Sequence, residues 1–157
     1  MSIDRCCRLL VLACLLLAAP AQAAVKVAVE VIGLAGEPLA NVRAALSIAQ
    51  REDQAITLRM ARDLHDRANR EIERALQPFG YYRPVIDATL APAGADDRWL
   101  ARYRVAAGEP VRVTQVQLDL DSNTDASTGL GELLAAWPLT AGQVLDHRRY
   151  RQGKDAL

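Results

Sequence analysis

The side chains that most often perform chemistry in proteins are sparse in this chain of 157 residues. Its two histidines are His65 and His147, and neither has a second ligand at the spacing of a metal site. The chain contains no Gly-x-Ser-x-Gly nucleophile elbow, no phosphate-binding glycine loop and no cluster of carboxylates around a histidine. The sequence therefore predicts no catalytic residue, no metal site and no cofactor.

Cysteine, the remaining common nucleophile, occurs at Cys6, Cys7 and Cys14. All three lie within residues 1–23, which have the parts of a secretory signal peptide in order: a basic start, an apolar run and a small-x-small triplet ending at Ala23. The apolar run is shorter than the ~20 residues that a helix needs to cross a bilayer. We expect export and cleavage after Ala23, with lipoprotein-type processing at Cys14 as the weaker alternative.

Charge and cysteine content limit what the exported part can be. It has no cysteine, so its fold must rest on a hydrophobic core rather than on disulfides. The whole sequence has 19 basic and 19 acidic residues, and removal of the signal peptide leaves a net charge of about −1. A nearly neutral chain has no electrostatic preference for nucleic acid, so we expect no nucleic-acid partner.

The elements that must position any functional group follow from the apolar pattern. Val25–Val31 alternates as a half-buried strand, and Glu37 with Pro38 can open a helix. Thr57 is a candidate N-cap for a longer helix whose apolar stripe runs over residues 61–79, and Gly80 is expected to end it in a left-handed conformation.

Two strands are predicted after the long helix. Pro84–Leu90 and residues 98–105 each alternate between apolar and polar side chains and are joined by a short loop, as in a hairpin. The order strand, helix, helix, strand, strand predicts an α+β fold, a βααββ module with a mixed three-stranded sheet and two helices on one face. We expect this module to occupy residues 24–107.

The same order begins again after Gly108-Glu109-Pro110, which we interpret as a linker over residues 108–110. We expect a strand at Val113–Leu120, a short helix over 130–137 and a longer helix from Asp146 to Leu157. Residues 111–157 would then be the first half of a second module, without the hairpin that completes its sheet. We therefore expect the sequence to be truncated relative to a functional protein.

The junction Leu76–Pro84 places Gly80, Tyr81 and Tyr82 between the long helix and the next strand. With the βααββ order and the export signal, this turn resembles the POTRA domains of the outer-membrane assembly factors, and among them those of the TamA (translocation and assembly module) branch. The resemblance covers roughly residues 25–157, one complete module and half of another.

The resemblance implies a periplasmic region ahead of an outer-membrane β-barrel, which is missing from this sequence. It implies outer-membrane or autotransporter client proteins, an inner-membrane-anchored TamB-like partner, and a role in translocating proteins or inserting them into the outer membrane. Two other functional classes stay open: a stand-alone periplasmic peptide-binding or chaperone-like protein, and an enzyme whose catalytic part is absent.

A sheet edge with unpaired main chain can accept an extended partner strand by β-augmentation. The resemblance implies that Pro84–Leu90 is such an edge, and we expect Val85, Asp87 and Thr89 to bind the partner. Proline at Asp87 or Thr89 is expected to remove a backbone donor from this edge.

Other residues have structural interpretations. Gly80, Tyr81 and Tyr82 are expected to form a structural turn, with at least one tyrosine packed at the corner between helix and strand rather than forming a recognition surface. The residues expected to act as an inter-module hinge are Gly108 and Pro110. A basic row on the second hairpin strand is expected to pair with Asp87 or Glu30 across the sheet, or to stay solvated, and consists of Arg98, Arg102 and Arg104.

Overall fold

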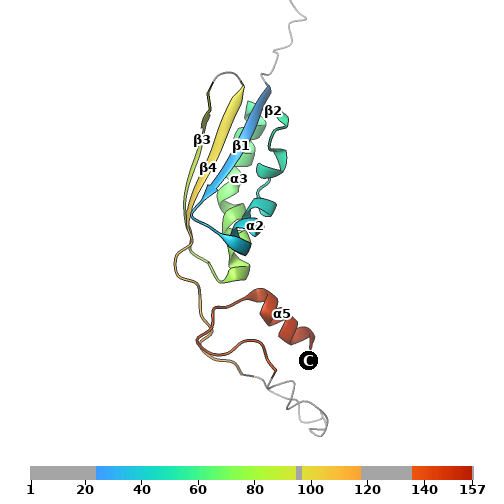
Figure 1. Cartoon of the computed structure of the whole chain (residues 1–157), viewed down its shortest axis with the longest axis vertical. Coiled ribbons are helices and arrows are strands. Elements are labelled where there is room, and N and C mark those ends of the chain that lie inside the picture. Colours follow the sequence, from blue (N-terminus) through green and yellow to red (C-terminus); the bar gives the residue numbers. More distant parts are fainter. Residues whose placement is uncertain (1–23, 95–96, 118–135, 157) are drawn as a thin grey trace, which may run out of the picture.

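The computed structural model describes residues 24–94, 97–117 and 136–156 (Figure 1). The expected signal peptide, residues 1–23, lies outside these ranges. The described elements are the strands β1 (Ala24–Ile32), β2 (Ala55–Thr57), β3 (Val85–Pro92) and β4 (Arg98–Ala106), and the helices α2 (Gly36–Ala45), α3 (Leu58–Leu76) and α5 (His147–Asp155). Two short 3-10 helices are η1 (Ala49–Arg51) and η2 (Gln77–Phe79).

The strands form a mixed sheet in the order β2-β1-β4-β3. β1 and β4 run parallel, whereas β2 is antiparallel to β1, and β3 is antiparallel to β4. The α+β class and the βααββ order are confirmed. The described sheet has a fourth strand that was not expected, because Ala55–Thr57, at the end of a polar connection, pairs with Ala24–Lys26.

The long helix begins and ends at its predicted caps, whereas the first helix ends earlier than the spacing of Leu46 and Ala49 predicts. Thr57 caps α3, since its hydroxyl accepts a hydrogen bond from the backbone N–H of Met60 at 3.2 Å. After α3 the chain tightens into η2 and ends at Gly80, which has the left-handed φ of 85°. α2 ends one residue before Leu46, whose side chain is fully buried beyond the helix.

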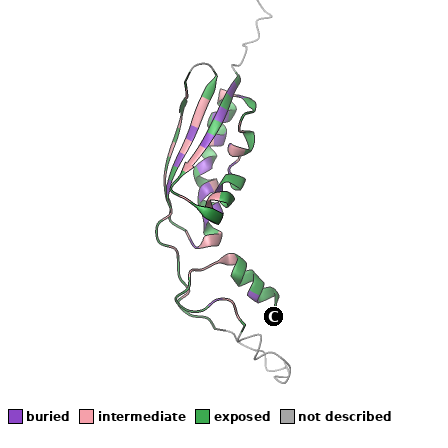
Figure 2. Ribbon diagram, viewed as in Figure 1, coloured by how far each residue is buried: buried purple, intermediate pink, exposed green. Residues whose placement is uncertain are grey.

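The hydrophobic core lies between the sheet and the helices (Figure 2). Val25, Val27 and Val29 of β1 face it, and the apolar stripe of α3 covers them. The core also includes these buried residues of α2, the following connection and β4: Val42, Leu46, Ile48, Ala101, Tyr103 and Val105. Because the opposite face of the sheet carries the polar residues of each strand, only one face is covered.

The second half differs from its expected element pattern. Residues 113–117 form no strand; an isolated bridge joins Arg112 to Val144 instead. The amide of Val113 donates to the carbonyl of Gln143 and that of Leu145 to the carbonyl of Val111, so 111–113 pairs with a loop rather than with another strand.

The remaining expectations for this half fall partly outside the described residues. Positions 118–120 of the expected strand and 130–135 of the expected short helix are not described, and Trp137 lies outside any helix or strand. The last helix is present as α5, with Asp146 as its N-cap. The edge of the Trp137 ring packs against Tyr150 of this helix, with centroids 6.2 Å apart.

Within the described ranges, no helix combines the length and apolar character needed to span a membrane.

Candidate partner-binding edge and module junction

β3 forms one edge of the sheet, with β4 on its inner side. The register pairs Ile86 with Val105 and Ala88 with Tyr103. Along an antiparallel pair, residues that exchange hydrogen bonds with the neighbour alternate with residues whose N–H and C=O point away from it. The direction of one amide therefore fixes the direction of all the others on this continuous strand.

The amide of Ala93 donates to the carbonyl of Arg98 at 2.9 Å. The register pairs Pro92 with Trp99, so Ala93 stands opposite Arg98 in the next pair. Because hydrogen-bonded and free positions alternate, the odd-numbered residues of β3 bond to β4. On the other side of β4, the carbonyl of Asp97 accepts from Lys26 of β1, which agrees with this alternation. Ile86, Ala88 and Leu90 therefore direct their backbone N–H and C=O groups away from the sheet.

This result corrects the sequence-based choice of partner-binding residues. The main-chain groups of Val85, Asp87 and Thr89 point toward β4, so proline at Asp87 or Thr89 would break the sheet rather than block its edge. Their side chains are exposed, on the face away from the helices. The side chains at the outward-directed positions are half-buried and pack against the core.

The other side of the sheet is covered at two places along β1. β2 covers the first residues of β1, and beyond it the backbone N–H of Val29 donates to Oε1 of Glu52 at 2.9 Å. Arg43 donates to Oε2 of the same carboxylate at 3.1 Å and lies 3.5 Å from the carbonyl of Val29. Side chains thus take the place of a neighbouring strand at Val29. Within the described residues, by contrast, no hydrogen bond meets the outward main-chain groups of Ile86, Ala88 and Leu90 on β3.

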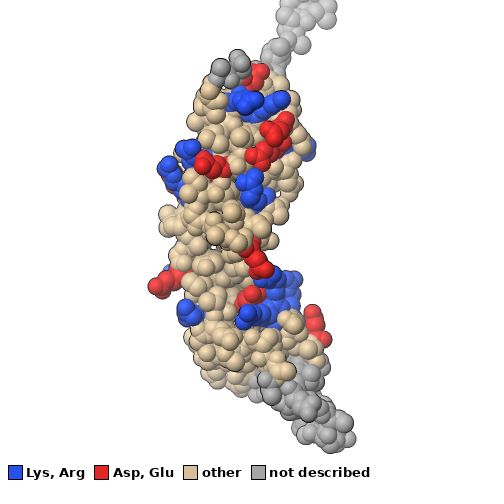
Figure 3. Space-filling model, viewed as in Figure 1, with Lys and Arg blue, Asp and Glu red and all other residues tan. Residues whose placement is uncertain are grey.

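The row of arginines on β4 is paired as expected for two of its members. Arg102 bonds to Glu30 at 2.6 Å, and Arg104 lies 3.7 Å from Asp87. Figure 3 shows charges of both signs interspersed over the first module, while lysine and arginine side chains gather over α5. The row therefore provides cross-strand ion pairs rather than a single basic field.

His65 and Tyr103 connect α3 to β4 beneath the sheet. Nδ1 of His65 lies 3.0 Å from the hydroxyl of Tyr103, whose side chain is fully buried. Burial, with a smaller contribution from the charge of Glu71, raises the pKa of Tyr103 well above its usual range, so the hydroxyl keeps its proton and can donate it to His65. Burial also lowers the pKa of His65. The pair is a structural contact of the core.

The turn Gly80-Tyr81-Tyr82 lies where the first module meets the second half. The carbonyl of Gly80 accepts a hydrogen bond from Val111 at 2.8 Å. A β-carbon at Gly80 would lie 3.0 Å from the carbonyl oxygen of Leu145. Tyr81 packs against the core, whereas Tyr82 is 40% exposed and its hydroxyl lies 2.6 Å from Nε2 of His147. One tyrosine thus packs at the corner, and the other contacts α5.

A second group of contacts crosses the same junction. Arg148 of α5 pairs with Glu37 in the first turn of α2, and its guanidinium lies 5.6 Å from the centroid of the Phe79 ring. Gly108, with a left-handed φ of 75°, and Pro110 lie in the connection between the halves, at the expected hinge positions. The contacts of Arg148 and Gly80 thus join the two halves on either side of this connection.

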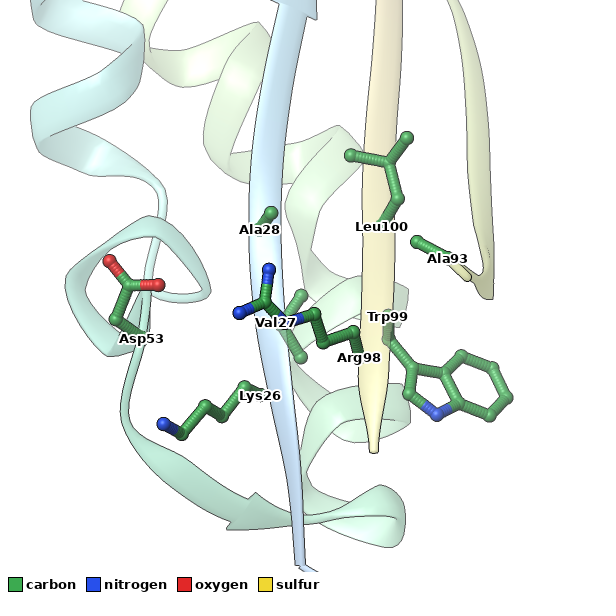
Figure 4. Close-up of a pocket in the computed structure, with 8 residues that line it drawn as sticks. All are labelled: Lys26, Val27, Ala28, Asp53, Ala93, Arg98, Trp99 and Leu100. Carbon is green, nitrogen blue, oxygen red and sulfur yellow. The ribbon is translucent and has the colours of Figure 1, made fainter. Parts of the chain in front are cut away.

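A shallow pocket of about 260 Å³ lies beside the first residues of β1 and β4 (Figure 4). Lys26 and Asp53 project on the β1 side, whereas Trp99 projects from β4 on the opposite side. The lining combines both signs of charge with the apolar side chains of Val27 and Leu100, and gives no clear ligand preference. In the part of the chain that the structure describes, no group of three or more histidine, cysteine or acidic side chains could hold a metal ion.

The βααββ order of the first module agrees with the family comparison. The family model described as POTRA domain TamA domain 1 matches residues 28–107. One similar solved structure is the crystal structure of Haemophilus influenzae BamA POTRA3-5, with 17% identity and a TM-score of 0.43, over 86% of this chain and 49% of that chain. The chain thus spans about half the length of that structure. Since the family match covers just over half of the sequence, the chain belongs to the family of TamA first POTRA domains.

Proposed function

We propose that this chain is the periplasmic POTRA region of an outer-membrane protein translocation and assembly factor, and that it binds extended client or partner segments by β-augmentation at β3. The family match supports the general role. The observation that carries the binding mode is the asymmetry of the sheet: β3 is open, whereas the edge at Val29 is closed by Glu52 and Arg43. Open edges are the sites at which extended segments add to a sheet.

The partners follow from the same proposal. The chain would be exported by a cleaved signal peptide and would hold client segments for a C-terminal β-barrel outside this sequence. Clients would be outer-membrane or autotransporter proteins, and an inner-membrane-anchored, TamB-like protein would be a second partner. Recognition through main-chain hydrogen bonds tolerates different client sequences, which suits a factor with many clients.

Hydrogen–deuterium exchange of the purified chain tests the binding mode. A capped seven-residue peptide of alternating valine and threonine serves as the extended probe. Strand addition predicts slower exchange on β3 when the peptide is present, with no change at β1 residues next to Glu52. Protection at β1 and β2 alone, or no protection of any strand at millimolar peptide, would contradict the proposal.

A matched variant controls for non-specific binding. Thr89→Ala alters an exposed side chain on β3 but no main-chain group. Because the proposed contact uses the main chain, this variant is expected to bind the probe as the unaltered chain does. A large loss of affinity in Thr89→Ala would show recognition through side chains and overturn β-augmentation as the mode.

A further inference from the structure

The positions flanking the open amides of β3 are prolines. Residues that direct their main chain outward have even numbers, and the next even positions on either side of Ile86, Ala88 and Leu90 are Pro84 and Pro92. Proline has no N–H to donate. In sheets it is found on edge strands where the N–H would face solvent, which agrees with the direction assigned to Pro92.

We propose that Ile86, Ala88 and Leu90 form a docking window of three amide donors whose length is set by Pro84 and Pro92, and that its occupant is a short amphipathic extended segment of another protein. This inference rests on the proposed function and adds its register, length and partner chemistry. A segment opposite the window pairs over about five residues, because each residue of a strand faces one residue of its neighbour. Longer pairing would place partner carbonyls opposite prolines that cannot donate.

The chemistry of the occupant follows from the two faces of β3. A partner side chain directly opposite a window residue lies on the same face as that residue. The window side chains are half-buried against the core on the helix face, so apolar partner side chains are favoured there. Asp87 and Thr89 are exposed on the other face, where polar partner side chains stay solvated. The favoured segment therefore alternates apolar and polar residues.

A second copy of the chain is the alternative occupant of the same edge. Val85, next to the window, is an exposed large apolar residue with 72% of its surface accessible, and it lies on the opposite face of the strand. A symmetric pair of β3 strands would match one window of three donors with another and leave this valine uncovered, which is far less contact than a stable dimer interface buries. The extended segment is therefore the occupant that we assign, and self-association is an outcome of the test.

The first experiment maps the window residue by residue. The amide exchange of the chain is followed by NMR, with the seven-residue valine–threonine peptide and with an eleven-residue peptide of the same alternation. The window predicts that both peptides slow exchange at Ile86, Ala88 and Leu90, and that their affinities agree within about threefold because the prolines stop further pairing. Protection that extends past Pro92, or an affinity that keeps rising with length, would overturn the window.

The second experiment changes the donors. Ala88→Pro removes the middle donor and leaves the bonds from β3 to β4 in place, so peptide affinity is expected to fall about five- to tenfold. Pro92→Thr adds one donor and is expected to raise affinity for the eleven-residue peptide about fivefold, with the seven-residue peptide unchanged. Pro92→Thr keeps the test decisive if Ala88→Pro does not fold.

The outcomes separate the window from the proposed function. No peptide-dependent protection anywhere on β3 would contradict both. Protection of β3 that is the same in Ala88→Pro and Pro92→Thr as in the unaltered chain would support strand addition but overturn the window. Protection of the three amides that appears without peptide and rises with protein concentration would identify a second copy as the occupant and overturn the assigned partner.

Discussion

The carboxylate of Glu52 accepts the backbone N–H of Val29 at 2.9 Å, although 23 residues separate the two positions in the sequence. Arg43 holds the other oxygen of that carboxylate at 3.1 Å. An unpaired strand edge is a template for pairing with other chains, and side chains that occupy its main-chain groups prevent this. The contact therefore keeps the β1 edge at Val29 from pairing with another strand.

Removal of this cap is expected to open the β1 edge. Glu52→Ala leaves the amide of Val29, which is 6% exposed as a residue, without its acceptor. The expected loss in the free energy of unfolding is about 1–3 kcal/mol, with faster amide exchange at Val29. Chemical denaturation and NMR exchange measure the two effects. Arg51→Ala is the control, since the side chain of Arg51 bonds to the exposed side chain of Gln54 and does not touch Val29; equal losses in both variants would contradict the capping role.

Gly80 is expected to be essential at the module junction. Gly80→Ala must adopt φ of 85° and brings its β-carbon within 3.0 Å of the Leu145 carbonyl oxygen. The left-handed conformation alone costs about 1–2 kcal/mol, which Gly94→Ala shares because φ is 82° there and nothing lies within 4 Å. The free energy of unfolding should fall further in Gly80→Ala than in Gly94→Ala. Equal losses of unfolding free energy in the two variants would show that the contact with Leu145 does not constrain Gly80.

Arg148 is expected to hold α5 against the first module. Its removal eliminates both the pairing with Glu37 and the contact with the Phe79 ring, so Arg148→Ala should broaden the distribution of distances between spin labels at Arg59 and Gln152. Arg151→Ala, on the same exposed helix, is the control. A distribution unchanged in Arg148→Ala would leave Gly108 and Pro110 free to act as the expected hinge.

Acid should loosen the same junction. The Arg148 hydrogen bond and charge lower the pKa of Glu37 below its ordinary value of 4.5. A lowered carboxyl pKa means that the stabilising contact is fully present above pH 4.5 and is lost as the pH falls through the lower folded value. The spin-label distances should therefore broaden only below that range, and Glu37→Gln should abolish the dependence. Broadening that persists unchanged in Glu37→Gln would implicate another group.

The stability of the first module should depend on pH through His65. Burial is the main cause that lowers its pKa below 6.5, and Asp66 partly opposes the shift. The unfolded chain then binds the proton more readily, so the free energy of unfolding should decline as the pH drops below about 6.5. Denaturation at several pH values measures this decline, and His65→Gln should reduce it. Tyr103→Phe removes the hydrogen bond but not the burial and should retain the pH dependence.

Much of the fold follows from local pattern. The alternation of valines in β1 and the three- and four-residue spacing in α3 identify their buried faces, because a side chain's direction repeats with the period of its element. Thr57 and Gly80 mark the ends of α3 and η2 through the conformations that they favour. β2 could not be predicted in this way, because three residues are too few to show a period.

The sequence by itself determined which side chains of β3 face the core, and the resemblance of its Gly-Tyr-Tyr turn indicated the family. Only the tertiary structure decided which amides of β3 are free. Main-chain direction also alternates along a strand, but whether an amide meets a neighbour depends on the side on which β4 lies and on its register. The same holds for the contact of Val29 with Glu52 and for the pairing of Arg148 with Glu37, because residues 23 and 111 positions apart meet only after the chain has folded.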